Sequence, residues 1–351
     1  MIGDSGRTSA SIRRAHARGV MGGSRRRLAA GVASFVLVGT GLAACSSASA
    51  GTGPVTLNYY LYPDTSGATQ MAIDNCDKQS GGKYTISYQQ LPQGADGQRQ
   101  QLVRRLAAHD DTIDIMGLDV TWEAEFATAN WIEPWTGTYK AQAVAGTLVP
   151  ALNTAIWKGQ LVAVPDNTNT QLLWYRSDLV PTPPTTWAQM IADAEQLAKE
   201  GKPHYIEIQG AQYEGTTVWF NTMLNSAGGT ALNSDATKVT LGAPAVKALS
   251  IMKQLASSTA ADPSLSVQME NQNRLQMEAG NAAFQLNYPF HADILTALQN
   301  ASVRPKTPVY QVVSIDISHL LSPPSKIDPV GTANAMVGQL NNALQAKGLV
   351  P

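Results

Sequence analysis

The chain has 351 residues, of which 44% are hydrophobic and 15% are charged, and its formal net charge is −1. This length supports one large domain or two ordinary domains with substantial cores. A composition with 7% aromatic residues and 29 glycines argues against a disordered or collagen-like chain, and a net charge near zero offers no field that attracts nucleic acid. We therefore expect a globular protein without a nucleic-acid partner.

The first 44 residues are basic, whereas the rest of the chain is acidic. Seven arginines lie in residues 1–44 beside a single acid, Asp4, so the remaining 18 basic and 25 acidic residues give the rest a charge of −7. An uncharged run at 28–44 follows the arginine triplet at 25–27 and is too short, with side chains too small, for a membrane span. This pattern predicts that residues 1–44 are a secretory signal peptide.

The uncharged run ends in Leu42-Ala43-Ala44-Cys45, which resembles the bacterial lipobox. In that signal the cysteine thiol carries the lipid and becomes the first residue of the mature protein. Because small and polar residues follow, we expect residues 45–54 to be a lipidated tether on the outer face of the cytoplasmic membrane. Cys76 is the second of two cysteines, so it is left alone in an oxidising compartment.

Strands and helices are expected to alternate after the tether. Hydrophobic residues at every second position over 55–61 are typical of a strand, and those at 102, 103 and 106 share one face of a helix. The expected elements in chain order are a strand at 55–62, a helix at 66–80, a strand at 84–88, a helix at 97–108 and a buried strand at 113–119. This order predicts an open α/β sheet, whose ligands bind beyond the carboxyl ends of the strands.

A second α/β stretch follows an asparagine-rich segment at 166–171. The expected elements are helices at 183–201, 215–227, 243–257 and 268–279 and strands at 205–208 and 282–287. We assign residues 55–168 to a first α/β lobe, residues 169–290 to a second α/β lobe and residues 291–351 to a C-terminal helical segment. Gly201 and Gly280 are the expected ends of two of the helices.

The sequence contains few motifs that indicate catalysis or metal binding. The sequence has no nucleophile elbow, no phosphate-binding loop and no dinucleotide fingerprint. The histidines of the mature chain are too dispersed for a local metal motif, so we expect no metal and no cofactor. Glycoside hydrolysis needs only two carboxylates, and it therefore stays open as an alternative. The candidate carboxylates are Asp119, Glu207, Glu214 and Glu270.

Aromatic and amide side chains gather in expected loops and strand ends. A sugar presents apolar C–H faces ringed by hydroxyl groups, so its sites combine aromatic rings with amide and carboxylate acceptors. Each aromatic residue has a core position as its alternative, and the 166–171 segment has ordinary turn chemistry as its alternative. The residues concerned are Trp122, Trp131, Trp135, Trp174, Trp219, Tyr288, Asn167, Asn169, Gln171, Asn221 and Asn287.

Several longer motifs resemble the substrate-binding lipoproteins of ABC sugar importers, most specifically the actinobacterial trehalose-binding group. They lie at 116–126, 167–175, 218–222, 287–290 and 303–311, and the resemblance covers nearly all of the mature chain. It implies a two-lobed, periplasmic-binding-protein-like α/β fold of class II that closes around a disaccharide. It also implies a monomer without catalysis that docks on membrane permease subunits.

The resemblance places the family's sugar contacts on six residues of this chain: Ser66, Gln98, Asp119, Asn169, Glu270 and Tyr288. Two of them differ from the family, which commonly has Asp in place of Ser66 and Trp in place of Tyr288. Hydroxyl recognition is therefore expected to be weaker at Ser66, while stacking is kept at Tyr288. Glu270 has an alternative role as an acid in the first turn of a helix.

The chain also departs from the family between Phe290 and His291, where a long stretch of the family's sequence is missing. That stretch returns to the first lobe, adds a second hinge crossing and carries a cysteine, so part of the first lobe and of the hinge is expected to be absent here. The resemblance implies that Cys76 has lost its disulfide partner. The expected function is capture of trehalose or a related disaccharide, with a secreted glycoside hydrolase and a non-functional truncated relative as alternatives.

Overall fold

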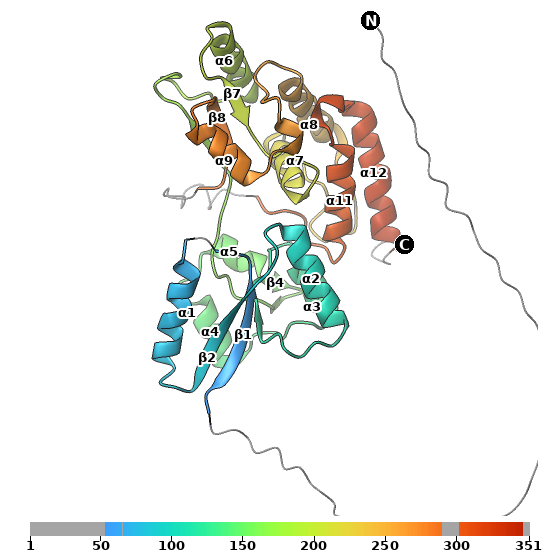
Figure 1. Cartoon of the computed structure of the whole chain (residues 1–351). Helices are drawn as coiled ribbons and strands as arrows, with labels where there is room; N and C mark the ends of the chain where they lie inside the picture. The colour runs from blue at the N-terminus through green and yellow to red at the C-terminus, as the bar shows by residue number, and fades with distance from the viewer. Residues whose placement is uncertain (1–52, 65, 290–301, 347–351) are drawn as a thin grey trace, which may run out of the picture. The chain divides into compact units, whose positions relative to one another are not determined.

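The computed structural model describes residues 53–64, 66–289 and 302–346 (Figure 1). The predicted signal peptide, most of the predicted tether and the Phe290–His291 junction lie outside these residues. Two α/β lobes are present, each with its own sheet. The first lobe runs from β1 to β5 and the second lobe from β6 to α12.

The first lobe contains a three-stranded parallel sheet in the order β2-β1-β3. The elements are β1 (Val55–Leu61), α1 (Ala68–Gln79), β2 (Tyr84–Gln90), α2 (Ala95–Ala107) and β3 (Ile115–Met116). The predicted order of strand, helix, strand, helix and strand is therefore confirmed. Crossover helices between parallel strands are the usual solution because the strands need long connections.

The prediction of a buried strand over 113–119 is wrong in length and in burial. Only Ile115 and Met116 form a strand, and Ile115 is 40% exposed. The carboxylate of Asp114 accepts the Asn58 N–H at 2.8 Å. If the strand were longer, a backbone carbonyl would accept this N–H in the sheet. Gly117 still donates to β1, after which the chain turns away. Side-chain competition for backbone groups thus shortens the strand.

Short elements complete the first lobe. They are α3 (Glu123–Thr128), α4 (Gly137–Val144), α5 (Val149–Thr154), β4 (Ile156–Trp157) and β5 (Gln160–Leu161). β4 and β5 form an antiparallel hairpin whose turn residues, Lys158 and Gly159, both have positive φ. Such a turn matches the twist of the two strands it joins. None of the residues of α4 is buried.

The second lobe contains a mixed sheet in the order β6-β8-β7. β8 lies in the centre, antiparallel to β6 and parallel to β7, and all six of its residues are buried. The elements up to β8 are β6 (Leu172–Tyr175), α6 (Trp187–Lys199), β7 (Tyr205–Glu207), α7 (Glu214–Ser226), α8 (Gly242–Ala256), η1 (Leu265–Val267), α9 (Glu270–Glu278) and β8 (Ala282–Asn287).

Residue chemistry at the helix ends explains the boundaries in this lobe. α6 begins at Trp187, later than expected, because the Thr186 hydroxyl caps it by accepting the Gln189 N–H at 3.1 Å. Gly201 follows α6 and Gly280 follows α9, both with positive φ as expected at helix ends.

The C-terminal elements α11 (Tyr310–Leu320), η2 (Pro324–Lys326) and α12 (Pro329–Ala346) pack into the second lobe. Residues such as Val313 and Leu340 share one hydrophobic cluster with Leu249 of α8 and Phe284 of β8. Among the described residues this cluster has 34 buried members, whereas that of the first lobe has five. The two lobes therefore differ greatly in the size of their cores.

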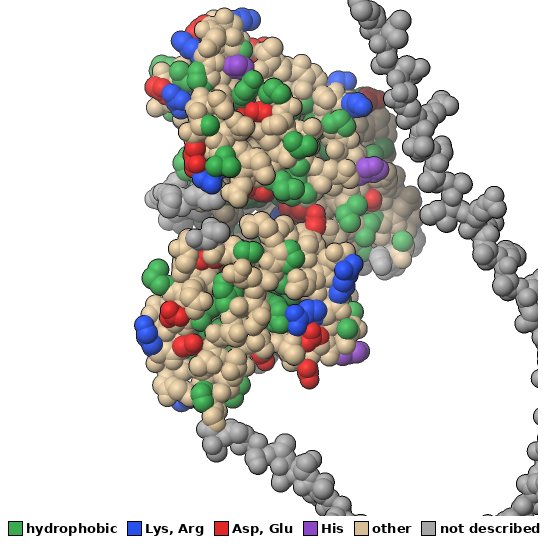
Figure 2. All heavy atoms as spheres, in the orientation of Figure 1, with side chains coloured by type: hydrophobic (Ala, Val, Ile, Leu, Met, Phe, Trp, Pro, Cys, Tyr) green, Lys and Arg blue, Asp and Glu red, His purple; other side chains and the backbone are tan. Residues whose placement is uncertain are grey.

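The surface carries no large charged field on the face in view. Figure 2 shows Lys and Arg side chains scattered among Asp and Glu side chains over the described residues. Such mixed charge is ordinary for a globular protein.

Candidate functional site

Arg304 connects two acidic side chains that lie far apart in the sequence. Its Nη2 atom is 2.9 Å from Asp119 Oδ1 and 3.2 Å from Asp119 Oδ2, and its Nη1 donates to Glu214. Asp119 follows β3, and Glu214 is the first residue of α7. The side chains of Arg304, Asp119 and Glu214 are only 16%, 25% and 11% exposed. The three residues form a largely buried ion cluster.

Burial and charge set the protonation of this cluster. Burial alone would raise the pKa of Asp119, but the Arg304 guanidinium and hydrogen bonds from Thr121 lower it below its ordinary value. Burial raises the pKa of Glu214 despite the opposing effect of Arg304. Burial would lower the pKa of Arg304, but the charges of Asp119 and Glu214 raise it well above its ordinary value. Arg304 therefore stays charged. The cluster thus has one ionised carboxylate, one less acidic carboxyl group and one fixed cation.

A second basic residue, Lys306, lies two positions further along the chain. Its Nζ donates to the Ile156 carbonyl at 3.0 Å and also to the Asn153 carbonyl. Nearby Glu123 is 6% exposed, and burial raises its pKa to about 9, with Lys306 partly opposing the shift. At neutral pH Glu123 is therefore protonated and can donate a hydrogen bond.

Tyr310 contacts the ion cluster, and the charges of the cluster act on two further tyrosines, Tyr288 and Tyr213. The Tyr310 hydroxyl donates to Glu214 Oε1 at 2.9 Å. Burial raises the pKa of Tyr288, and the charges of Glu214, Glu270 and Asp119 act in the same direction. Burial and the adjacent Glu270 likewise raise the pKa of Tyr213, whose buried hydroxyl makes no geometrically sound hydrogen bond among the described residues. The site thus combines neutral phenol groups and aromatic faces with charged acceptors and a donor.

Three of the six predicted sugar contacts belong to this region: Asp119, Glu270 and Tyr288. Glu270 is the first residue of α9, as its alternative role required, and its carbonyl accepts from Asn287 at 2.9 Å. Asn287 also receives the Tyr288 N–H on its Oδ1, at 2.9 Å. This pair of hydrogen bonds fixes the chain where β8 ends.

The other three predicted contacts make local hydrogen bonds in the described structure. The exposed Ser66 donates to Asp64 Oδ1 at 2.6 Å, before α1. Gln98 Nε2 donates to the Gln93 carbonyl at 3.2 Å, and Asn169 Oδ1 accepts the Thr170 N–H at 3.0 Å. None of these bonds joins Ser66, Gln98 or Asn169 to the ion cluster.

The sequence reasoning missed Arg304, Lys306, Tyr213 and Tyr310 as site residues. It treated Glu214 only as a possible catalytic carboxylate, alongside Glu207. The available signal was that Arg304 and Lys306 are the sole basic residues of the stretch 302–318, which is otherwise largely apolar. A cation in a tail that packs into the fold needs hydrogen-bond acceptors, whether carbonyl or carboxylate oxygens, and these can lie far away in the sequence.

Glu207 lies away from this site, in the core of the second lobe. It is fully buried, and both carboxylate oxygens lack a geometrically sound hydrogen bond in the described structure. Burial raises its pKa to about 8, and the adjacent Asp262 acts in the same direction. Glu207 is enclosed in the packed lobe, so it offers no accessible carboxylate for the glycoside-hydrolase alternative.

The aromatic and amide candidates divide between core and site. Trp122 and Trp219 are buried in the two hydrophobic clusters, which confirms their alternative core role. Gln171, at the end of the asparagine-rich segment, donates to Gln209 at 2.9 Å and accepts from Thr222 at 3.2 Å. It therefore stabilises the second lobe.

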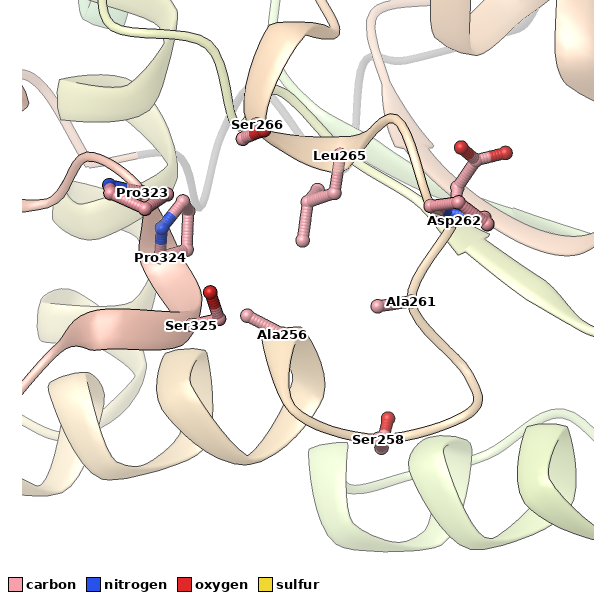
Figure 3. A pocket seen from close by; sticks show the side chains of 10 residues that line it. Ala256, Ser258, Ala261, Asp262, Leu265, Ser266, Pro323, Pro324 and Ser325 are labelled. Atoms are coloured by element: carbon pink, nitrogen blue, oxygen red, sulfur yellow. The ribbon is translucent and has the colours of Figure 1, made fainter. Parts of the chain in front are cut away.

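A separate pocket of about 250 Å³ lies beside α8, η1 and η2 (Figure 3). Its lining includes Ser258, Asp262, Ser266, Pro323 and Ser325. Figure 3 shows the Asp262 carboxylate turned away from the space that these residues enclose. None of the predicted sugar contacts lines this pocket.

Two general searches complete the description of the site. Within residues 53–64, 66–289 and 302–346, no group of three or more His, Cys, Asp or Glu side chains is arranged to hold a metal ion. The helices in this part of the chain lack the combination of length and hydropathy needed to cross a membrane.

Comparison with known proteins gives a family match over most of the chain. The family of bacterial extracellular solute-binding proteins matches residues 63–311. A probable ABC transporter-binding protein of Deinococcus radiodurans is 26% identical over 217 residues, which are 59% of this chain and 51% of that protein. The match thus spans about half the length of that relative.

Solved structures with the same fold are also solute-binding proteins. Maltose-bound MalE3 of T. maritima has a TM-score of 0.74 at 20% identity, covering 82% of this chain and 99% of that chain. The cyclic alpha-maltosyl-1,6-maltose binding protein of Arthrobacter globiformis has a TM-score of 0.65 at 18% identity. The match covers 84% of this chain and 100% of that chain. These likenesses confirm the predicted two-lobed α/β fold of class II.

Proposed function

The chain belongs to the bacterial extracellular solute-binding proteins, and from this premise we propose that it captures a sugar outside the cell membrane for an ABC importer. The observation that carries the proposal is the cluster of Asp119, Glu214 and Arg304 beside Tyr288 and Tyr310. Carboxylates accept hydrogen bonds from sugar hydroxyl groups, a guanidinium holds such carboxylates in place, and a tyrosine ring covers an apolar sugar face. Such a set suits a neutral polyhydroxylated ligand.

Within this class we propose trehalose or a related disaccharide as the ligand. The support is the resemblance of five long motifs to trehalose-binding lipoproteins. We assign the ligand contacts to Ser66, Gln98, Asp119, Asn169, Glu270 and Tyr288. In support, Asp119 accepts a hydrogen bond from Arg304, the charges of Arg304 and Glu270 both act on Tyr288, and Ser66 and Asn169 are exposed.

The cellular part of the proposal follows from the N-terminal sequence and the family. Cys45 carries the lipid anchor, the protein acts as a monomer, and its closed, sugar-bound form is recognised by the permease subunits. The chain itself catalyses no reaction, since its family and the similar solved structures are solute-binding proteins.

We further propose that a segment of the first lobe and of the hinge is missing at the Phe290–His291 junction. Three features of the described structure support this. The first lobe has five residues in its hydrophobic cluster, β2 has no buried residue, and Cys76 is exposed and unpaired. Parallel sheets are normally covered on both faces. The segment is either deleted from the gene or omitted when the gene was joined from its sequence. Sequencing the DNA across these two codons separates the two, because a true deletion leaves one uninterrupted reading frame, whereas an omitted segment or a frameshift appears in the other case.

Thermal denaturation with a panel of sugars tests the proposed function. A ligand at about 100 times its Kd stabilises the native state by about 2.7 kcal/mol, which is a shift of several degrees in Tm. We expect trehalose or a related disaccharide to raise Tm, and glucose 6-phosphate to have no effect. A cooperative melt that no sugar shifts would contradict the proposal, while the absence of a cooperative melt would support the alternative of a non-functional truncated relative.

A further inference from the structure

Arg304 uses separate nitrogen atoms for two carboxylates. Nη1 donates to Glu214, and Nη2 donates to both oxygens of Asp119. The guanidinium also lies near the Tyr310 ring, 5.9 Å from its centroid, and the Tyr310 hydroxyl donates to the same Glu214 oxygen. A planar guanidinium held at three points has little freedom to turn. Arg304 is therefore a rigid link between Asp119 and Glu214.

The two oxygens of Asp119 are used unequally. Oδ1 receives the Thr121 N–H at 3.0 Å, the Thr121 hydroxyl at 2.8 Å and Arg304 at 2.9 Å. Oδ2 receives only the longer 3.2 Å contact from Arg304 among the described residues. An ionised carboxylate has about four acceptor sites. The remaining capacity lies on Oδ2, and the Asp119 side chain is 25% exposed.

From this geometry we propose that Arg304 is a positioning residue for ligand hydroxyl groups: it fixes Asp119 ionised, with Oδ2 free to accept from the ligand. The inference rests on the proposed sugar-binding function and deepens it. Arg304 acts through Asp119, whose two oxygens both accept from its Nη2 atom, while its Nη1 atom is held by Glu214. Its charge opposes the burial that would otherwise raise the pKa of Asp119.

Calorimetric titration of trehalose into the full chain, repeated at several pH values between 5 and 8, tests this role. We expect wild-type affinity to be nearly independent of pH over this range. R304M should bind more weakly and lose about a further tenfold toward pH 5, because an isolated buried carboxylate takes up a proton. R304K should keep most of the pH independence, because the lysine keeps the positive charge beside Asp119. It lacks the planar fork of the guanidinium.

Two further variants separate positioning from general structure. D119N carries no titrating group at this position, so adding R304M to it should cost little more affinity and should introduce no pH dependence. R99M is the matched control, because Arg99 pairs with Glu125 at a similar exposure, 18% and 20%, outside the site. It should bind sugar as the wild type does. Circular dichroism melts confirm that each variant is folded.

The outcomes are distinguishable. If the wild type binds sugar and R304M has the same affinity and pH profile, the positioning role is overturned and the proposed function stands. Additive effects of R304M and D119N would also overturn it. If the folded wild type binds no sugar at any pH, both the proposed function and this inference are refuted.

Discussion

Arg304 donates to Asp119 at 2.9 Å although 185 positions of the chain separate them. The acid follows the third strand of the first lobe, and the arginine precedes α11, which packs in the second lobe. A second hydrogen bond between the C-terminal segment and the first lobe joins Gln311 Nε2 to Asp96 Oδ1 at 2.8 Å. The surroundings of Asp119 therefore include residues of the C-terminal segment.

Tyr288 is expected to supply an aromatic face for the sugar. Tyr288→Ala should weaken trehalose binding by about tenfold or more, because a stacked ring contributes roughly 1 kcal/mol beyond the area it buries. Tyr288→Trp should keep or improve affinity. Equilibrium titration measures both variants, and Tyr139→Ala is the control because Tyr139 of α4 is 71% exposed. Wild-type affinity in Tyr288→Ala would exclude the stacking role.

The buried Glu207 should make stability depend on pH. Its pKa is raised to about 8 by burial and by Asp262. A raised carboxyl pKa means that the stabilisation is fully present below the unfolded value near 4.5 and is lost as pH rises toward 8. Glu207→Gln mimics the protonated form at all pH values. Relative to this variant, the wild type should lose stability between pH 5 and 8, on the order of 3 kcal/mol in total.

Urea unfolding at several pH values measures this difference. The matched control is Glu278→Gln on α9, because the Glu278 side chain is 56% exposed and pairs with Arg274. It should leave the pH dependence of the wild type unchanged. Parallel stability curves for the wild type and Glu207→Gln would show that Glu207 does not hold its proton in the native state.

The two lobes should differ in their resistance to local opening. The first lobe has five residues in its hydrophobic cluster, whereas the second has 34. Because protection against hydrogen exchange follows the buried contacts that must open, amides of β1 and β2 should exchange faster than those of β8 and α8. Exchange followed by mass spectrometry measures this. Equal protection in both lobes would contradict a first lobe that lacks part of its core.

Local patterns in the sequence predicted most of the elements. Alternation at 55–61 predicted β1, and the stripe of Met190, Ile191, Ala194 and Leu197 predicted α6, because each signal depends only on neighbouring residues. β3 was predicted too long because the side chain of Asp114 competes with the backbone of a strand 56 positions away. No periodicity contains that information.

The site was harder to predict than the fold. Resemblance to a family pointed to Asp119, which pairs with Arg304, and to Glu270 and Tyr288, which interact through their charges. The role of Arg304 depends on a tertiary contact with Asp119 and Glu214, and neither partner is near it in the sequence. Glu207 was weighed together with Asp119, Glu214 and Glu270 because its complete burial is a property of the packed sheet. Local reasoning finds which residue types are present, and the fold decides which of them meet.

Calorimetric titration of trehalose into the folded chain tests the central claim most directly. Maltose and glucose serve as comparison ligands, and Asp119→Asn serves as the site variant. We predict saturable binding of trehalose or a related disaccharide at one site, weakened at least tenfold in Asp119→Asn, because a hydrogen bond to a charged acceptor contributes about 1.5 to 3 kcal/mol. A cooperatively folded protein that gives no heat of binding with any of these sugars would contradict the account.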